Sequence, residues 1–148
     1  KLMKRLLELV LLGVFLILVS GFGSTKTDLT LKITNIQEIK GELIIALYDK
    51  KNHFPKKGME LKKIILKIRE STIVHTIRDL PKKEYAVAVF QDENSDQKCN
   101  LNFFGIPEER FGFSNNFIPK LLVPNFDEVK FKLDQPKTLE IKLVKMEY

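Results

Sequence analysis

Alternation of apolar and polar residues with a period of two is the feature that most constrains this chain. It runs through residues 29–34 and again through residues 139–143 near the C-terminus. A period of two places every second side chain on the same face, which is the pattern of a β-strand with one face on a core. The sequence therefore predicts an all-β fold.

Seven segments carry strand patterns: residues 29–34, 43–48, 61–68, 73–77, 85–90, 129–133 and 139–143. Residues 43–48 and 85–90 are apolar on both faces, so we expect central strands that are covered on both sides. Residues 61–68 fit a helix or a strand, and we favour a strand. Asp79, Leu80 and Pro81 are expected to end the fourth strand. Seven strands without a clear helix predict a seven-stranded antiparallel β-sandwich, with one long ordered loop, residues 91–126, between strands five and six.

The N-terminal segment has the layout of a secretory signal peptide. Lys1, Lys4 and Arg5 precede an apolar run over residues 9–19, and small residues follow at 20–24. This run is shorter than the roughly 20 residues that a membrane-spanning helix needs. We expect residues 1–23 to be a signal peptide that leaves no stable transmembrane anchor after cleavage, and residues 24–148 to form a single domain. Because the one cysteine, Cys99, is far downstream, no lipid attachment is expected, and the product is expected in the periplasm or outside the cell.

Composition narrows the classes of partner. The 148 residues carry a net charge of +6, and removal of the first 23 leaves +4. The lysines are scattered singly along alternating segments rather than gathered into an arginine-rich stripe, so nucleic acid is not an expected partner. A component of the cell envelope or another protein is the expected partner.

The first half of the long loop, residues 92–102, contains regularly spaced side-chain oxygens. They fall at alternating positions one, three, five and nine of the segment, in Asp92, Asn94, Asp96 and Asn100. Oxygens at this spacing on a turning loop are candidate calcium ligands. Gln97 and Phe103 stand where an EF-hand loop has glycine and a bidentate glutamate. The alternative, which we favour, is that these side chains cap backbone N–H groups in Asx turns.

The second half of the loop, residues 103–117, holds five of the 11 phenylalanines. They either form a small core of their own or expose an apolar surface to a partner, and we favour the small core. Pro107 is expected to open one helical turn with Glu108 and Glu109 at its N-terminus, and Ser114 to cap a turn. Candidate residues of a binding surface are Phe104, Glu108, Arg110, Phe111, Phe113, Asn115 and Asn116.

Several of these stretches together resemble a known family. They are Leu80-Pro81, residues 85–90, Asp92-Glu93-Asn94, the segment from Phe104 to Glu108, and residues 111–116. The chain resembles the bacterial family of uncharacterised exported proteins called DUF2141. The resemblance implies a transthyretin-like or immunoglobulin-like β-sandwich behind a signal peptide, with no established activity.

The chain departs from the pattern of this family at four positions: Lys83, Gln91, Gln97 and Asn100. At the last two, it lacks a flexible turn residue and a carboxylate that the family usually has. Cys99 falls where the family tends to have leucine, so we expect a small buried side chain there.

Two classes of function follow. The first is an exported, non-catalytic binding or interaction module, with calcium as its one candidate cofactor. The second is a hydrolase of cell-envelope polymers that uses loop carboxylates as acid and base or nucleophile, namely Asp92, Glu93, Glu108 and Glu109. We favour the binding module, because catalysis needs a cleft with matched carboxyl groups and the sequence shows only a loop. An enzyme is therefore not expected.

Overall fold

The structure is a computed structural model that describes residues 24–102, 107–119 and 123–146. These residues form eight β-strands, one 3-10 helix and one short α-helix. The elements, in chain order, are β1 (Lys26–Thr34), β2 (Glu42–Tyr48), β3 (Lys62–Lys67), β4 (Ile73–Pro81), β5 (Lys83–Asp92), β6 (Phe111–Phe113), η1 (Ser114–Asn116), α2 (Phe126–Val129), β7 (Phe131–Leu133) and β8 (Lys137–Lys142). The all-β prediction is confirmed, and the prediction of seven strands is wrong.

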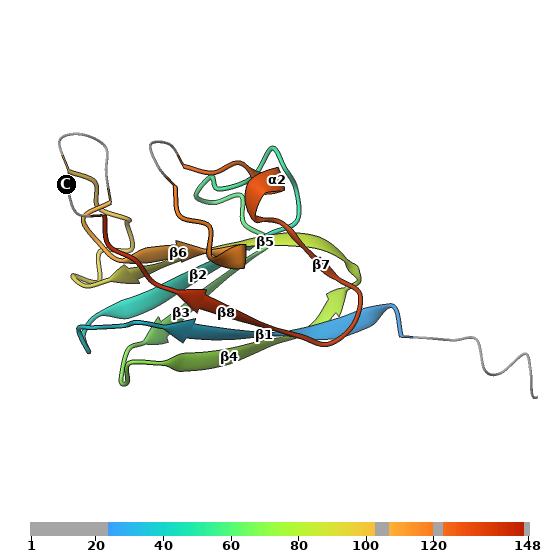
Figure 1. Cartoon of the computed structure of the whole chain (residues 1–148), viewed down its shortest axis with the longest axis horizontal. Helices are drawn as coiled ribbons and strands as arrows, with labels where there is room; N and C mark the ends of the chain where they lie inside the picture. Colours follow the sequence, from blue (N-terminus) through green and yellow to red (C-terminus); the bar gives the residue numbers. More distant parts are fainter. Residues whose placement is uncertain (1–23, 103–106, 120–122, 147–148) are drawn as a thin grey trace, which may run out of the picture.

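The strands form two sheets (Figure 1). The smaller sheet has the order β4-β1-β8. The larger has the order β3-β2-β5-β6, and β7 also pairs with the first residues of β5. The first and last strands, β1 and β8, run parallel, with Leu29 opposite Lys137 and Thr34 opposite Lys142, whereas the other strand pairs are antiparallel. The expectation of a wholly antiparallel arrangement is therefore wrong for this pair.

A hydrophobic core fills the space between the two sheets. Alternate residues of β1 contribute to it, and Leu29, Leu31 and Ile33 are fully buried. β2 and β5 supply the opposite side of this core, and in β2 the alternate residues Leu43 and Leu47 are fully buried as well. Burial of each such side chain stabilises the fold by about 1.5–3 kcal/mol. The period-two pattern read from the sequence therefore corresponds to the packed faces of the sheets.

The connection over residues 91–126 is not a single loop. It contains β6, which pairs with β5 from Phe90 opposite Phe111 to Ala88 opposite Phe113, and it also contains η1. A strand of three residues is too short to show periodicity, which is why the sequence did not reveal it. The helical turn expected after Pro107 is not formed, because Pro107 instead pairs with Leu101 in an isolated β-bridge.

Two other element boundaries differ from expectation. β4 continues to Pro81, because Asp79 takes a positive φ of 57° without ending the strand. Val129, expected in a strand, ends α2. This helix is set by a capping box, in which the Asn125 side chain accepts the Glu128 N–H and the Glu128 side chain accepts the Asn125 N–H. Residues 61–68, by contrast, form a strand as favoured, with β3 over Lys62–Lys67.

Candidate functional site

The larger sheet is apolar on its outer face as well as its inner one. In β2, Leu43, Ile45 and Leu47 belong to the core between the sheets, and the residues between them face outward. On this outer face lies a second hydrophobic cluster that α2 and the loop after β2 cover in part (Figure 1). Its buried members are Tyr48, Phe54, Ala86, Phe111, Phe113, Phe126 and Val129. The expectation that β2 and β5 are covered on both sides is confirmed in part, because Ala46 and Ala88 on the outer face are partly exposed.

The aromatic rings of this cluster meet edge to face. Phe54 is central, with its ring centroid 5.2 Å from that of Tyr48, 6.1 Å from Phe113 and 6.2 Å from Phe126. Edge-to-face contacts at these distances are favourable beyond the burial of area. Phe111 and Phe113 are buried here and Phe117 is partly buried, so the prediction of a small phenylalanine core is confirmed for these three. Phe103 and Phe104 lie outside the described residues.

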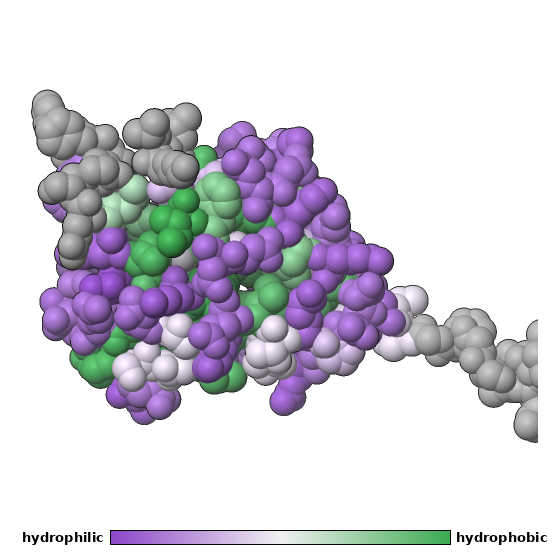
Figure 2. All heavy atoms as spheres, in the orientation of Figure 1, coloured by the Kyte–Doolittle hydropathy of each residue, from purple (hydrophilic) through white to green (hydrophobic). Residues whose placement is uncertain are grey.

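Beside this cluster, the outer face of the sheet forms the floor of a cavity of about 330 Å³. A volume of this size lies in the range of small-molecule sites. Figure 2 shows hydrophobic surface above β6, next to hydrophilic residues. The floor comes from alternate residues of three strands: Ile44, Ala46, Ala88, Phe90, Phe111 and Phe113. Leu101 and Val123 line the cavity too, and they are 56% and 62% exposed.

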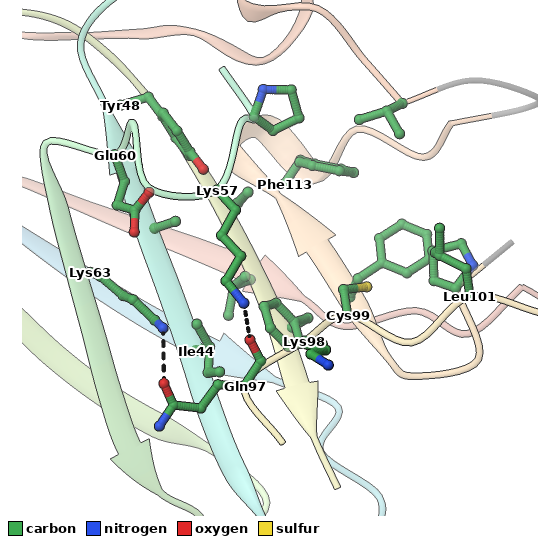
Figure 3. A pocket seen from close by; sticks show the side chains of 18 of the residues that line it. Ile44, Tyr48, Lys57, Glu60, Lys63, Gln97, Lys98, Cys99, Leu101 and Phe113 are labelled. Carbon is green, nitrogen blue, oxygen red and sulfur yellow. Dashed lines mark hydrogen bonds between the residues drawn. The ribbon is translucent and has the colours of Figure 1, made fainter. Parts of the chain in front are cut away.

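One wall of the cavity carries two lysines that are held by a single residue. The Lys57 ammonium donates a hydrogen bond of 2.9 Å to the Gln97 carbonyl oxygen, and the Lys63 ammonium donates one of 3.3 Å to Gln97 Oε1 (Figure 3). Lys57 comes from the loop after β2, Lys63 from β3, and Gln97 from the loop after β5. Since both acceptors are neutral, neither of these hydrogen bonds pairs a lysine with a negative charge.

A carboxylate and a phenol lie at another part of the wall. Oε2 of Glu60 is buried and has no hydrogen-bond partner among the described residues. Tyr48 donates a hydrogen bond of 3.4 Å to the Lys56 carbonyl oxygen, and burial together with the nearby Glu60 charge raises the pKa of Tyr48 to about 12. The Tyr48 hydroxyl therefore stays protonated at any physiological pH.

Three of the four candidate calcium ligands, Asp92, Asn94 and Asp96, accept backbone N–H groups in this structure, whereas the Asn100 side chain hydrogen-bonds to the Asp96 side chain. Asp92 is fully buried; its Oδ1 accepts the Asp96 N–H at 3.1 Å and its Oδ2 accepts the Gln97 N–H at 2.7 Å. Asn94 Oδ1 accepts the Asp96 N–H, and Asp96 Oδ1 accepts the Lys98 N–H. This is the Asx-turn arrangement favoured from the sequence. Within the described part of the chain, no group of three or more His, Cys, Asp or Glu side chains is placed to hold a metal ion.

Glu109 links the two ends of this loop through its carboxylate. It is 5% exposed, and its two carboxylate oxygens accept the N–H groups of Glu93 at 3.1 Å and Asn100 at 3.2 Å. Burial raises the pKa of Glu109, and the two backbone hydrogen bonds oppose that rise. Glu108 is exposed and Glu93 forms an ion pair with Lys40. The four carboxylates of the hydrolase hypothesis are thus in different environments.

The predicted binding-surface residues have several different positions. Phe111 and Phe113 line the cavity, Arg110 donates to the side chain of Gln37, and Phe104 lies outside the described residues. The Asn115 amide group donates to the carbonyl oxygens of Val129 and Lys130. These residues are therefore not gathered on one surface.

Asn116 and Ser114 link the connection to neighbouring elements. Asn116 donates to the Glu140 carbonyl oxygen at 3.0 Å and accepts the Lys142 N–H at 2.8 Å, which ties η1 to β8. Ser114 is fully buried, and its hydroxyl donates to the Val129 carbonyl oxygen at 2.6 Å and accepts the Val87 N–H at 3.0 Å. The hydroxyl thus joins β5 to α2.

Sequence reasoning missed the residues of the cavity wall. Lys57 and Lys63 are close in sequence, but Gln97 is 40 and 34 positions away from them, and no local pattern relates the three. The one indication in the sequence was that residues 43–48 and 85–90 are apolar on both faces, so that a second apolar contact is expected on the face turned away from the core. The expectation that Cys99 is buried is wrong, because this residue is exposed where it lines the cavity. Although the residue as a whole is exposed, neighbouring atoms desolvate its thiol, and this effect, with a smaller one of the Glu109 charge, raises the pKa of Cys99 to about 11.

In the described residues, no helix has the length and apolarity to span a membrane.

Comparison with known proteins identifies the family. No curated protein and no solved structure matches the chain. The family described as "Uncharacterized protein conserved in bacteria (DUF2141)" matches residues 31–141, a range that contains β2 to β7, the second half of β1, all but the last residue of β8, and the whole cavity floor. The chain therefore belongs to the DUF2141 family.

Proposed function

We propose that this protein is an exported, non-catalytic binding module that holds an apolar small molecule in the cavity on the outer face of its larger sheet. The observation that carries the proposal is that this sheet is apolar on both faces. Ala46 and Ala88, small residues on the cavity floor, are partly exposed between larger apolar side chains. Apolar surface left open in this way is favourable to cover with an apolar ligand.

The experiment is titration of the full chain with phenylnaphthylamine, a neutral probe that fluoresces in apolar sites. We expect saturable binding and displacement by dodecanol. Ala88→Phe and Ala46→Leu, which fill the floor, should each reduce binding at least tenfold. Val74→Phe, at a position that is 62% exposed on the smaller sheet, is the matched control and should bind as the unaltered protein does. Absence of saturable binding, or equal binding by the filled variants, would contradict the proposal.

The hydrolase alternative has less support from the geometry. Glu109 and Asp92 are buried with both carboxylate oxygens on backbone N–H groups, and Glu108 is exposed. Each carboxylate oxygen of Asp92 and Glu109 is thus already bound to a backbone N–H group, whereas glycoside hydrolysis requires two carboxyl groups that are available to the substrate.

Calcium stabilisation of the loop at residues 92–102 stays a prediction. Addition of calcium should raise the unfolding midpoint if the loop binds it, and a chelator should reverse the rise. Asp96→Ala removes one candidate calcium ligand and keeps the buried Asp92 side chain that caps the loop. A smaller effect of calcium in this variant would therefore reflect the loss of a ligand and not the loss of the cap. Equal midpoints with calcium and with chelator would contradict the prediction.

Two further parts of the proposal concern export and architecture. We propose cleavage of residues 1–23 as a signal peptide, which mass spectrometry of the protein recovered from the exported fraction would test. We also propose, on the family resemblance, a transthyretin-like or immunoglobulin-like sandwich. Superposition of an experimental structure on both folds would test that assignment.

A further inference from the structure

The cavity is apolar over most of its lining and positively charged along one wall. Lys57 and Lys63 lie on this wall, and their ammonium groups both end at Gln97 (Figure 3). Neither ammonium forms an ion pair with a carboxylate of the described residues, in contrast to Lys40 and Lys83 elsewhere on the surface. Two positive charges held beside an apolar floor are complementary to a ligand that is apolar at one end and anionic at the other.

We propose, resting on the proposed function, that the cavity binds a single-chain amphiphile whose anionic head group lies between Lys57 and Lys63. The cavity volume of about 330 Å³ is at the low end of small-molecule sites, which favours one acyl chain over two. The chain lies on the floor formed by β2, β5 and β6. The head group accepts charge-assisted hydrogen bonds from the two ammonium groups.

The position of the two ammonium groups is set by a relay of hydrogen bonds from the buried end of β5. Asp92 Oδ2 accepts the N–H of Gln97 at 2.7 Å. This bond holds Gln97 in its left-handed conformation, with φ of 59°, and so directs the Gln97 carbonyl and side-chain oxygens to the two lysines. Asp92 is therefore a positioning residue for the head-group site, and the acidic loop has a use that does not depend on metal.

Glu60 is the residue of the cavity wall that would favour a cationic ligand instead of an anionic one. Its buried, unpartnered oxygen would accept a hydrogen bond from an alkylammonium group. Among the described residues that line the cavity, however, there are three lysines, Lys57, Lys63 and Lys98, and this one carboxylate, so the charge of the lining favours an anion. Glu60→Gln therefore has opposite consequences under the two hypotheses: it strengthens binding of an anionic ligand and weakens binding of a cationic one.

The experiment compares three ligands of one chain length: dodecanoate, dodecanol and dodecylammonium, each below its micelle concentration. Displacement of phenylnaphthylamine from the full chain gives the affinities. We expect dodecanoate to bind at least tenfold more tightly than dodecanol, and dodecylammonium to bind least tightly. The double variant Lys57→Gln, Lys63→Gln should lose the preference for dodecanoate while it keeps the affinity for dodecanol. The double variant Lys56→Gln, Lys62→Gln, which changes the neighbouring lysines outside the cavity, is the matched control.

The possible results separate the two proposals. Equal binding of dodecanoate and dodecanol would overturn the anionic head group and leave the binding module standing. Tightest binding by dodecylammonium, lost in Glu60→Gln, would overturn it in favour of a cationic ligand. Failure of all three ligands and of the probe to bind would overturn the proposed function itself.

Discussion

Asp92 has both carboxylate oxygens on backbone N–H groups of the loop that follows it, and it is fully buried. Asp92→Ala leaves these two N–H groups without their partner, so we expect the free energy of unfolding to fall by about 1–3 kcal/mol. Urea denaturation measures this loss. Asp28→Ala is a suitable control, because Asp28 also accepts a backbone N–H, that of Asp79, at an exposed site, and its loss should be smaller. Equal effects of the two substitutions would contradict the role assigned to burial.

Cys99 offers a chemical measurement at the cavity. Because its thiol pKa is raised to about 11, the reactive thiolate is scarce at neutral pH. The rate of alkylation by iodoacetamide should rise about tenfold per pH unit from pH 8 to pH 10, where an ordinary cysteine with a pKa of about 8.5 would already level off. Dodecanol should slow the reaction if it occupies the cavity that Cys99 lines. A plateau below pH 9 would show that the thiol is not desolvated.

At the scale of elements, the turn that leads into β2 lies against the end of β5. Gly41 has a φ of +71°, and a Cβ atom there would collide with the Asp92 carbonyl oxygen. Gly41→Ala thus combines left-handed strain with a clash against backbone. We expect a loss of well over 2 kcal/mol of unfolding free energy.

Gly58 provides the matched control for this substitution. Its φ is +80°, and nothing lies within 4 Å of the Cβ position. Gly58→Ala should therefore show the strain alone, about 1–2 kcal/mol. Thermal unfolding of the two variants measures the difference, and similar losses would mean that the contact with β5 is not close.

The strands also show which parts of the fold the sequence could predict. β2 and β5 were recognisable as central because their residues are apolar on both faces, a property of each segment by itself. β6 and the parallel pairing of β1 with β8 were not recognisable, since one is three residues long and the other joins residues about a hundred positions apart. The cavity wall could not be predicted either, because its residues are also far apart in the sequence. Asp92 and Gln97 were recognisable as loop residues, but the hydrogen bonds that Gln97 accepts from Lys57 and Lys63 exist only in the folded structure.

For the whole molecule, a ligand in the cavity should stabilise the folded state. Dodecanol at about 100 times its dissociation constant should add about 2.7 kcal/mol to the free energy of unfolding, because the unfolded chain has no such site. This gain corresponds to a rise of roughly 10 °C in the unfolding midpoint of a domain of this size. Differential scanning calorimetry measures it, with Ala88→Phe as the variant that should not respond. A rise of the same size in that variant would place the ligand elsewhere.

The parallel pairing of β1 and β8 also determines how the domain would resist a pulling force. Residue Lys26 begins β1 at one end of the smaller sheet, and Lys142 ends β8 at the other. Tension between these two points runs along both strands, so it loads their interstrand hydrogen bonds in shear, all at once, instead of opening them in sequence. A domain tethered through its first and last strands would therefore extend only after this whole set of bonds breaks together, which is the geometry of a mechanically resistant link.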